Sequence, residues 1–253
     1  MSAERQEQIR TLLQEHGNLS VAELAKQLRV SEMTIRRELR TLSAQGLVQR
    51  AHGRALYPPI TSDASFFMRL GEAESEKNAI GRLAAEMIKE RESVILDAGT
   101  TTLAAAKFIH KNCVVISNSL PISSVLANRG EEITVLVTGG EVRGATQALV
   151  GPMARLAIAN FNADKVFLAA TGVSIERGLS TDNMLESEVK QAMLAGAKQV
   201  ILLAHSQKFG KVYYHTFAQW DKVHTVITDS GLPEKTHREL EALGVEVLIA
   251  LDQ

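Results

Sequence analysis

The sequence predicts an α/β protein of two parts, a small N-terminal domain that is mainly helical and a larger domain built on a mostly parallel β-sheet. Along residues 1–57 apolar side chains recur at helical spacing, whereas from residue 76 onward short apolar runs alternate with helical stretches. The charge divides in the same way, because residues 1–57 carry nine Lys and Arg against six Asp and Glu, and the remainder carries 19 against 23. We therefore expect a first domain over 1–57, a linker over 58–75 and a second domain over 76–253.

The composition is typical of a soluble globular protein of the cytoplasm, with 45% hydrophobic and 23% charged residues. The one cysteine, Cys113, lies in an apolar run, which favours a buried small side chain and excludes an internal disulfide. The first residues have no apolar signal core, and no apolar stretch approaches the roughly 20 residues of a membrane span. We therefore expect a cytoplasmic protein without membrane contact.

Three helices are predicted in the first domain. Apolar spacing places the first over about residues 3–16. Ser20 and Glu23 form an S-x-x-E capping box at the start of a short second helix. Ser31 caps a third helix that runs to about Gln45.

The second and third helices are joined by a tight turn at Arg29 and Val30, which makes them a helix-turn-helix. Residues 47–56 predict a two-stranded wing that turns near Gly53. In this motif the N-terminal residues of the last helix reach base edges in the major groove. The sequence therefore predicts a winged helix-turn-helix that binds double-stranded DNA, the alternative being a winged helix that binds another protein.

The third helix and the wing supply the candidate DNA contacts. We interpret Glu32, Thr34 and Arg37 as readers of base edges, because they lie near the start of the third helix. The arginines nearby are better placed for phosphates, and Glu38 is interpreted as a charge on the helix surface. The predicted DNA-binding residues are Ser31, Glu32, Thr34, Arg36, Arg37, Arg40, Arg50, His52 and Arg54.

The string VSEMTIRREL from Val30 to Leu39, followed by Gly46-Leu47 and by Arg50–Gly53, resembles the signature of the DeoR family of bacterial sugar regulators. The family usually has Asp where Glu38 stands and Gly where Arg54 stands. The resemblance implies a transcription regulator, more often a repressor than an activator. It also implies dimers or tetramers that place two reading helices on operator half-sites.

Strands alternate with helices throughout the second domain. Such short, continuously apolar strands indicate a mostly parallel sheet covered by helices on both faces. The predicted strands are Val94–Asp97, Val114–Ser117, Thr134–Thr138, Val166–Ala170, Val200–Ala204, Val223–Thr228 and Val245–Leu251. The predicted helices are 76–90, 102–110, 119–128, 184–197 and 232–243.

The turn from Asp97 to Thr102 follows the first of these strands and leads directly into a helix. A small, hydroxyl-rich turn at a helix N-terminus offers backbone N–H groups and the positive end of the helix dipole, which suit a phosphate. The alternative is ordinary N-capping by one of the threonines. Asp97 is better suited to accept hydrogen bonds from sugar hydroxyls or to orient the loop.

Polar or small residues also follow other strands, and the carboxyl ends of parallel strands share one edge of the sheet. Lys208 is a natural counter-ion for a phosphate, whereas Arg143 pairs with an anion or lies on the surface. We therefore predict an effector site at this edge. Its predicted residues are Asp97, Gly99, Thr100, Thr101, Thr102, Asn118, Ser119, Gly139, Gly140, Arg143, Glu186 and Lys208.

These loops continue the DeoR resemblance, which implies a phosphorylated sugar as effector and includes Glu186 ahead of Lys190. Family members usually carry Asp near the position of Ala204-His205. The predicted sensor fold is also similar to ribose-5-phosphate isomerase, whose phosphate loop resembles Gly99–Thr102.

That similarity raises an alternative of another class, a DNA-binding domain fused to a working isomerase. Isomerisation needs a base and acids, and the isomerase has an Asp-Gly-Ala-Asp-like run after a middle strand. The corresponding residues here, Ala169–Gly172, include no carboxylate, so we expect binding without turnover and no catalytic residues. The histidines are scattered and dinucleotide or Walker motifs are missing, so no metal or cofactor is expected.

Overall fold

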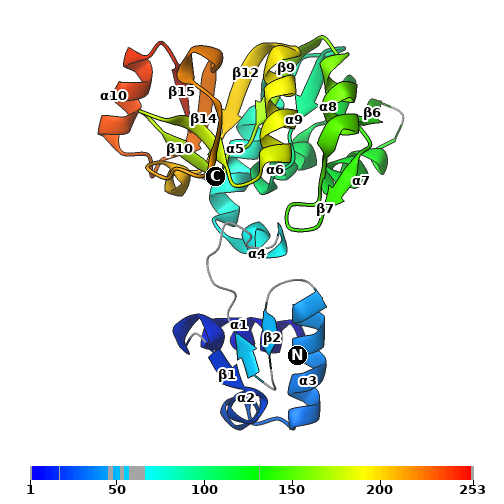
Figure 1. The fold of residues 1–253 in the computed structure, drawn as a ribbon, viewed down its shortest axis with the longest axis vertical. Helices are drawn as coiled ribbons and strands as arrows, with labels where there is room; N and C mark the ends of the chain where they lie inside the picture. Colours follow the sequence, from blue (N-terminus) through cyan, green and yellow to red (C-terminus); the bar gives the residue numbers. More distant parts are fainter. Residues whose placement is uncertain are drawn as a thin grey trace. The chain divides into compact units, whose positions relative to one another are not determined.

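The computed structural model describes residues 2–16, 18–44, 48–51, 54–56, 66–130 and 132–251. The chain divides into two compact units, Met1–Glu72 and Ala73–Gln253 (Figure 1). We call them the DNA-reading unit and the sensor unit, after the functions that the sequence predicts.

The DNA-reading unit packs three helices against a small antiparallel sheet with the strand order β1-β3-β2. The elements of this winged helix-turn-helix part are α1 (Ser2–His16), β1 (Asn18–Ser20), α2 (Val21–Leu28), α3 (Glu32–Ala44), β2 (Gln49–Ala51) and β3 (Arg54–Leu56), and α4, described below, is the last helix of the unit. The three predicted helices and the wing strands are present. Strand β1 was not predicted, and it adds a third strand beside β3.

Local signals explain where these helices begin and end. The Ser20 hydroxyl accepts a hydrogen bond from the Glu23 amide at 3.1 Å, and the Glu23 carboxylate accepts one from the Ser20 amide at 2.6 Å. This is the predicted capping box of α2. Arg29 then takes a left-handed conformation (φ 53°) that ends α2 and makes the tight turn. Buried Ile9, Leu24 and Leu39 come from the three helices and share one core.

Helix α4 (Phe66–Gly71) and the first residues of α5 (Glu74–Glu86) lie inside the stretch 58–75 that was predicted as a linker. Phe66 and Met68 of α4 are buried. The second half of this stretch is therefore helical, while residues 58–65 lie outside the described part of the chain.

The sensor unit is built on a parallel seven-stranded sheet with the order β15-β14-β12-β9-β4-β5-β6. These strands are β4 (Ser93–Leu96), β5 (Cys113–Ser117), β6 (Ile133–Val137), β9 (Ala163–Leu168), β12 (Ala197–Leu203), β14 (Thr225–Asp229) and β15 (Glu246–Ala250). Each corresponds to one of the seven predicted strands, so the predicted mostly parallel sheet is confirmed.

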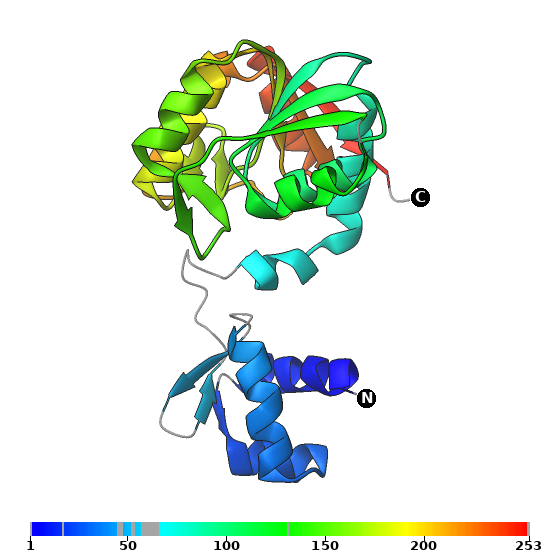
Figure 2. The same ribbon diagram turned by 90° about the vertical axis from the view of Figure 1, so that its right-hand side faces the viewer.

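Helices cover both faces of the sheet (Figure 2). On one face lie α5, α6 (Thr100–Phe108) and α7 (Leu120–Ala127), and on the other lie α8 (Gly151–Ala159) and α9 (Met184–Ala195). Helix α10 (Glu234–Ala242) connects β14 to β15. The chain fills the sheet outward in both directions from β4 and β9, so the order of the strands reverses between these two. In such sheets ligands bind outside the carboxyl ends of the strands at the reversal point.

Two small antiparallel sheets complete the sensor unit, and neither was predicted. One is the hairpin of β7 (Glu141–Arg143) and β8 (Ala148–Val150), and the other has the order β10-β11-β13. The strands of the second are β10 (Gly172–Ser174), β11 (Gly178–Thr181) and β13 (His215–Ala218). Helix α8 was not predicted either. These elements border the carboxyl edge of the large sheet, where the candidate ligand site lies.

Candidate nucleic-acid interface and ligand site

Helix α3 has an inner face in the core and an outer face in solvent. Ile35, Leu39 and Leu42 are at most 1% exposed, whereas Arg37 and Arg40 are exposed. At the start of the helix the Ser31 hydroxyl accepts a hydrogen bond from the Thr34 amide at 3.2 Å, which is the predicted cap. The packed inner face therefore fixes the position of α3, while the outer face stays in solvent.

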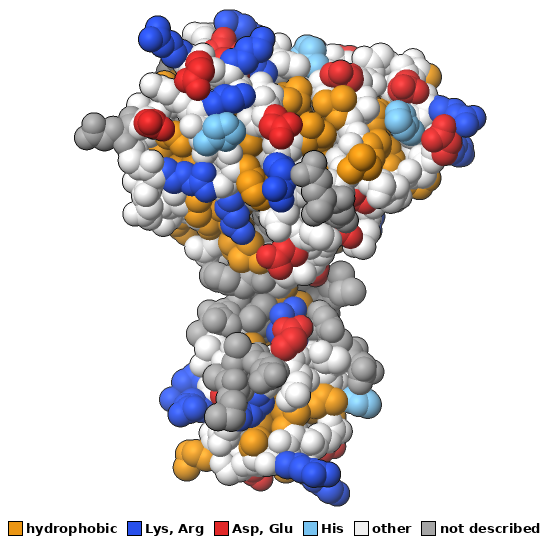
Figure 3. All heavy atoms as spheres, turned by 180° about the vertical axis from the view of Figure 1, so that it is seen from behind, with side chains coloured by type: hydrophobic (Ala, Val, Ile, Leu, Met, Phe, Trp, Pro, Cys, Tyr) orange, Lys and Arg blue, Asp and Glu red, His pale blue; other side chains and the backbone are white. Residues whose placement is uncertain are grey.

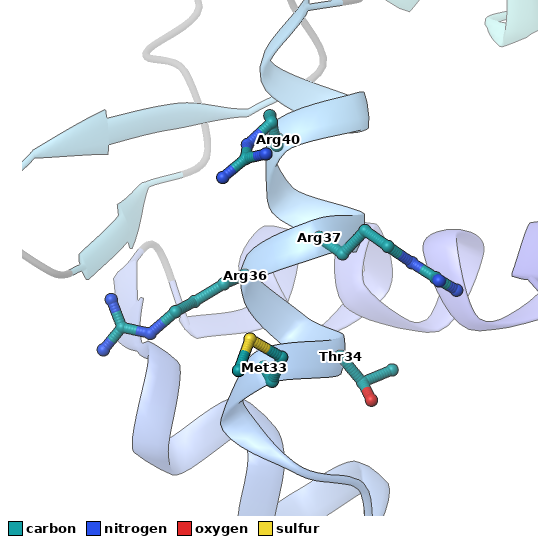
Figure 4. Close-up of a pocket in the computed structure, with 5 residues that line it drawn as sticks. All are labelled: Met33, Thr34, Arg36, Arg37 and Arg40. Atoms are coloured by element: carbon teal, nitrogen blue, oxygen red, sulfur yellow. The ribbon is translucent and has the colours of Figure 1, made fainter.

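The outer face of α3 carries a shallow hollow lined by Met33, Thr34, Arg36, Arg37 and Arg40 (Figure 4). Arg36 and Arg37 point to opposite sides of Met33 in this view. Glu32 pairs with Arg36 at 3.3 Å, with both side chains half exposed, so this pair holds the two residues only weakly. Three arginines on an exposed helix face suit the phosphates and guanine edges of DNA.

Glu38 was interpreted as a surface charge, and this interpretation is wrong. The residue is 2% exposed, and its carboxylate accepts hydrogen bonds from the Gln6 amide group at 2.6 Å and from Arg5 at 3.4 Å. Both partners lie on α1. Glu38 therefore ties the first helix to the inner side of the recognition helix α3.

Only part of the wing lies among the described residues. Strands β2 and β3, which hold Arg50 and Arg54, pair in antiparallel register with Ala51 opposite Arg54. His52 lies outside the described residues. The predicted DNA contacts at the wing therefore stay predictions.

At the carboxyl edge of the sensor sheet, Asp97 follows β4 and lies at the reversal point. It is 1% exposed, and its Oδ2 accepts a hydrogen bond from the Ala169 amide, just after β9, at 2.9 Å. The same oxygen pairs with the buried Lys190 of α9. Oδ1 of Asp97 is buried without a hydrogen-bond partner among the described residues, so it can accept one from a ligand.

Burial raises the pKa of Asp97, and the Lys190 ammonium opposes this rise. Lys190 also donates a hydrogen bond to the Ala169 carbonyl at 2.9 Å and lies over the Phe217 ring, 5.4 Å from its centre. A cation in contact with the loops after both β4 and β9 therefore occupies the reversal point.

The threonines after Asp97 begin α6 at Thr100, two residues before the predicted helix start at residue 102. Gly99 is the N-cap residue and gives no side-chain hydrogen bond, while the Thr102 hydroxyl donates to the Gly99 carbonyl at 3.0 Å. Thr101 and Thr102 are buried, and Thr100 is half-buried. Because α6 begins where β4 ends, its first N–H groups point out from the carboxyl edge of the sheet.

Lys77 in the first turn of α5 is only 4% exposed. A Cβ added to Gly81 would meet the Ala104 backbone at 2.6 Å, so α5 and α6 touch there. Both helices begin at the carboxyl edge, because α5 runs into β4 and α6 runs out of it. Lys77 lies one turn before Gly81 on α5, and Thr100 lies one turn before Ala104 on α6. Because the two helices run side by side, Lys77 lies beside the start of α6.

Lys208 lies in a short 3-10 helix, Ser206–Lys208, that follows β12. The preceding His205 is 5% exposed, and burial, with help from Lys208 and Lys77, lowers its pKa to about 4. His205 is therefore neutral at pH 7. Both Lys208 and Lys77 lower the pKa of His205 through their charge, so both lie near this residue.

Asn118 and Ser119 follow β5 and are fully buried. The Asn118 side chain accepts a hydrogen bond from the Ala98 amide at 2.9 Å and donates one to the Leu149 carbonyl at 3.3 Å. Ser119 caps α7. Asn118 therefore joins the Asp97 loop to the β7–β8 hairpin, and its side-chain oxygen already has a protein partner.

The β7–β8 hairpin is fastened to α9 through Glu186. This carboxylate accepts hydrogen bonds from Thr146 at 2.5 Å, from Arg143 at 3.2 Å and from Thr181 at 3.2 Å. Arg143 also lies 3.8 Å from Asp182. Two residues predicted to meet the effector, Arg143 and Glu186, thus meet each other.

Gly139 and Gly140 lead into this hairpin with φ of +68° and +117°. The structure thus places all the predicted effector residues along or beside the carboxyl edge. The sequence did not indicate Lys77, and Lys190 entered only through the family motif that begins at Glu186, since lysines on amphipathic helices usually lie in solvent. Their nearness to the Asp97 turn depends on how distant elements pack.

On the surface in Figure 3, the sensor unit carries positive and negative side chains intermingled, with hydrophobic side chains between them. Among the described residues, no cluster of His, Cys, Asp and Glu fits a metal ion. In the described part of the chain, no helix is both long and apolar enough to cross a membrane.

Two family models match the chain, "DeoR-like helix-turn-helix domain" over residues 5–61 and "DeoR C terminal sensor domain" over residues 72–230. The HTH-type transcriptional regulator GlpR of Haloferax volcanii is 33% identical, with 98% of each chain covered. The HTH-type transcriptional repressor GlcR of Bacillus subtilis is also 33% identical, with 97% of this chain and 95% of its own covered. A solved D-ribose-5-phosphate isomerase in complex with phospho-erythronic acid is similar over 54% of each chain, at 14% identity and a TM-score of 0.40. The predictions of a regulator and of no enzymatic activity are confirmed, and the chain belongs to the DeoR family of transcriptional regulators.

Proposed function

We propose that this regulator represses a carbohydrate-metabolism operon and that a phosphorylated sugar, bound at the carboxyl edge of the sensor sheet, controls its affinity for operator DNA. The observation that carries the proposal is the turn from Asp97 to Thr102 at the reversal point, with Lys190 and Lys77 buried beside it. Repression is favoured by the name of the relative GlcR.

Groups that suit a phosphate and a group that suits a hydroxyl donor lie close together at this turn. The N-terminus of α6 and the cations Lys77 and Lys208 favour a phosphate. The buried Oδ1 of Asp97 favours a hydroxyl donor such as a sugar. A ligand that carries both groups matches both, whereas the unphosphorylated sugar offers no anion to the start of α6.

Two copies of the chain place two α3 helices on operator half-sites about one helical turn, or multiples of it, apart. The effector changes operator affinity only through its different affinity for two arrangements of the protein. A preference of about 100-fold corresponds to about 2.7 kcal/mol.

The test is fluorescence anisotropy of the full chain on DNA fragments that flank its own gene, repeated with a panel of sugar phosphates and their unphosphorylated parents. We expect tight, salt-sensitive binding to one fragment and a change of affinity with one phosphorylated sugar alone. Binding no better than to random DNA contradicts the regulator function. Specific binding that no sugar phosphate alters contradicts only the proposed effector, and turnover of the same panel is then assayed as a control for isomerase activity.

A further inference from the structure

Met33 is the second residue of α3 and is 78% exposed, more than any other described large hydrophobic side chain except Tyr214. A single exposed apolar residue on a protein surface ordinarily needs no explanation. Met33 differs through its surroundings, because the hollow that it helps to line is otherwise formed by Thr34 and three arginines.

The helix period fixes where this side chain points. Residues three, four and seven positions after Met33 are Arg36, Arg37 and Arg40, so all four lie on one face of α3. The buried Ile35, Leu39 and Leu42 lie on the opposite face. Met33 is therefore the apolar centre of a cationic face, and it projects directly away from the core (Figure 4).

The polar side chains beside Met33 already have partners. Thr34 shares a hydrogen bond with the Ser31 hydroxyl at 2.9 Å, and Glu32 pairs with Arg36. At the N-terminal end of a recognition helix, side chains on the outer face reach base edges in the major groove. The apolar group presented by base edges in that groove is the C5-methyl of thymine.

We propose that Met33 is a specificity-determining residue that packs against the C5-methyl group of a thymine in each operator half-site. The arginines on either side bind the DNA around this contact and exclude water from it. The inference rests on DNA binding by α3, and not on the identity of the effector.

The experiment first selects bound sequences from a random duplex library with the full-length wild-type protein. The selected duplex is then made with each thymine in turn replaced by deoxyuridine, which removes the methyl group and nothing else. We expect one position per half-site at which this replacement weakens wild-type binding about fourfold, as the loss of one buried methyl group predicts.

Met33→Gln keeps the length of the side chain and removes its apolar end. We expect this variant to bind the thymine and deoxyuridine duplexes equally, and Met33→Leu to keep the preference for thymine. Arg40→Ala should weaken binding to both duplexes by the same factor, and Met153→Gln, a change at a 66% exposed residue of the sensor unit, should alter neither.

The proposal is overturned if Met33→Gln loses the same factor as the wild type at every position. It is also overturned if no deoxyuridine replacement affects the wild type, which would indicate a sugar or phosphate contact instead. Failure to enrich any sequence would contradict sequence-specific DNA binding itself, so the two failures can be told apart.

Discussion

Lys190 and Asp97 form an ion pair whose side chains are 5% and 1% exposed. Removal of one partner of a buried pair leaves an uncompensated charge in the interior. We expect Lys190→Met to lower the free energy of unfolding of the sensor unit by about 3–5 kcal/mol. Urea titration followed by fluorescence measures this, because the one tryptophan, Trp220, is buried in the sensor unit.

The chain offers a matched control in Lys198, which pairs with Asp164 at 2.8 Å while 76% exposed. We expect Lys198→Met to change the same free energy far less than Lys190→Met does, because solvent screens an exposed ion pair. The double variant Asp97→Asn with Lys190→Met should recover part of the loss of the single variant. Equal, small effects at Lys190 and Lys198 would contradict the burial of the charge.

His205 predicts a pH dependence of stability. Its folded pKa of about 4 lies below the ordinary value of 6.5, mainly because of burial, so the unfolded chain binds more protons between these pH values. The stabilisation is therefore complete above about pH 6.5 and is lost as the pH falls toward 4, with a total of at most about 3 kcal/mol.

The measurement is the unfolding free energy of the wild type and of His205→Asn from pH 7 to pH 4.5. We expect the wild-type curve to fall more steeply than that of the variant. Parallel curves would show that His205 titrates alike in the folded and unfolded chain.

Sequence patterns predicted which residue types lie near the ligand site, but not which charges are buried. Glu38 was interpreted as a surface charge because its partners on α1 stand more than 30 residues away. Lys77 was missed for the same reason, and Lys190 was noted only as part of a family motif, since helical spacing shows a face but not what covers it. Asp97 was found because its signal is local, a polar turn between an apolar strand and a helix.

At the scale of elements, the β7–β8 hairpin depends on the backbone at Gly140. Its φ of +117° suits glycine alone, and an added Cβ would lie 2.6 Å from the Val150 carbonyl oxygen. We expect Gly140→Ala to destabilise the sensor unit by more than about 1 kcal/mol. Gly144→Ala in the same hairpin meets no atom within 4 Å and should change stability by less than about 0.5 kcal/mol. Thermal unfolding compares the two, and similar melting temperatures would contradict the strain at Gly140.

The seven strands of the parallel sheet were all predictable, because each contains a run of consecutive apolar residues, even though the edge strands β6 and β15 are partly exposed. The strands of the small antiparallel sheets are only three or four residues long, which is too short for an alternating pattern. Their pairing is fixed by contacts from elsewhere in the chain, such as β13 against β11. The reversal point itself follows from the strand order, which the sequence pattern does not contain.

At the scale of the molecule, the chain divides into two compact units, and we propose that DNA binding resides in one and effector binding in the other. We expect Arg37→Ala to weaken operator binding about 10–100-fold, through loss of a base or phosphate contact, while leaving sugar-phosphate binding unchanged. Lys208→Ala should do the reverse. Anisotropy with labelled DNA and calorimetry with the sugar phosphate found in the panel measure the two affinities, and a matched loss of both in either variant would contradict separable sites.

Helix α3 also bears on how such a regulator evolves. The residues that hold it in place, Ile35, Leu39 and the buried Glu38, are different from the exposed residues that we propose to face DNA. Changes on the outer face therefore alter which operators are recognised at little cost in folding. Duplicated copies of such a gene can acquire new target genes by a few substitutions, while the inner face and the sensor unit are inherited intact.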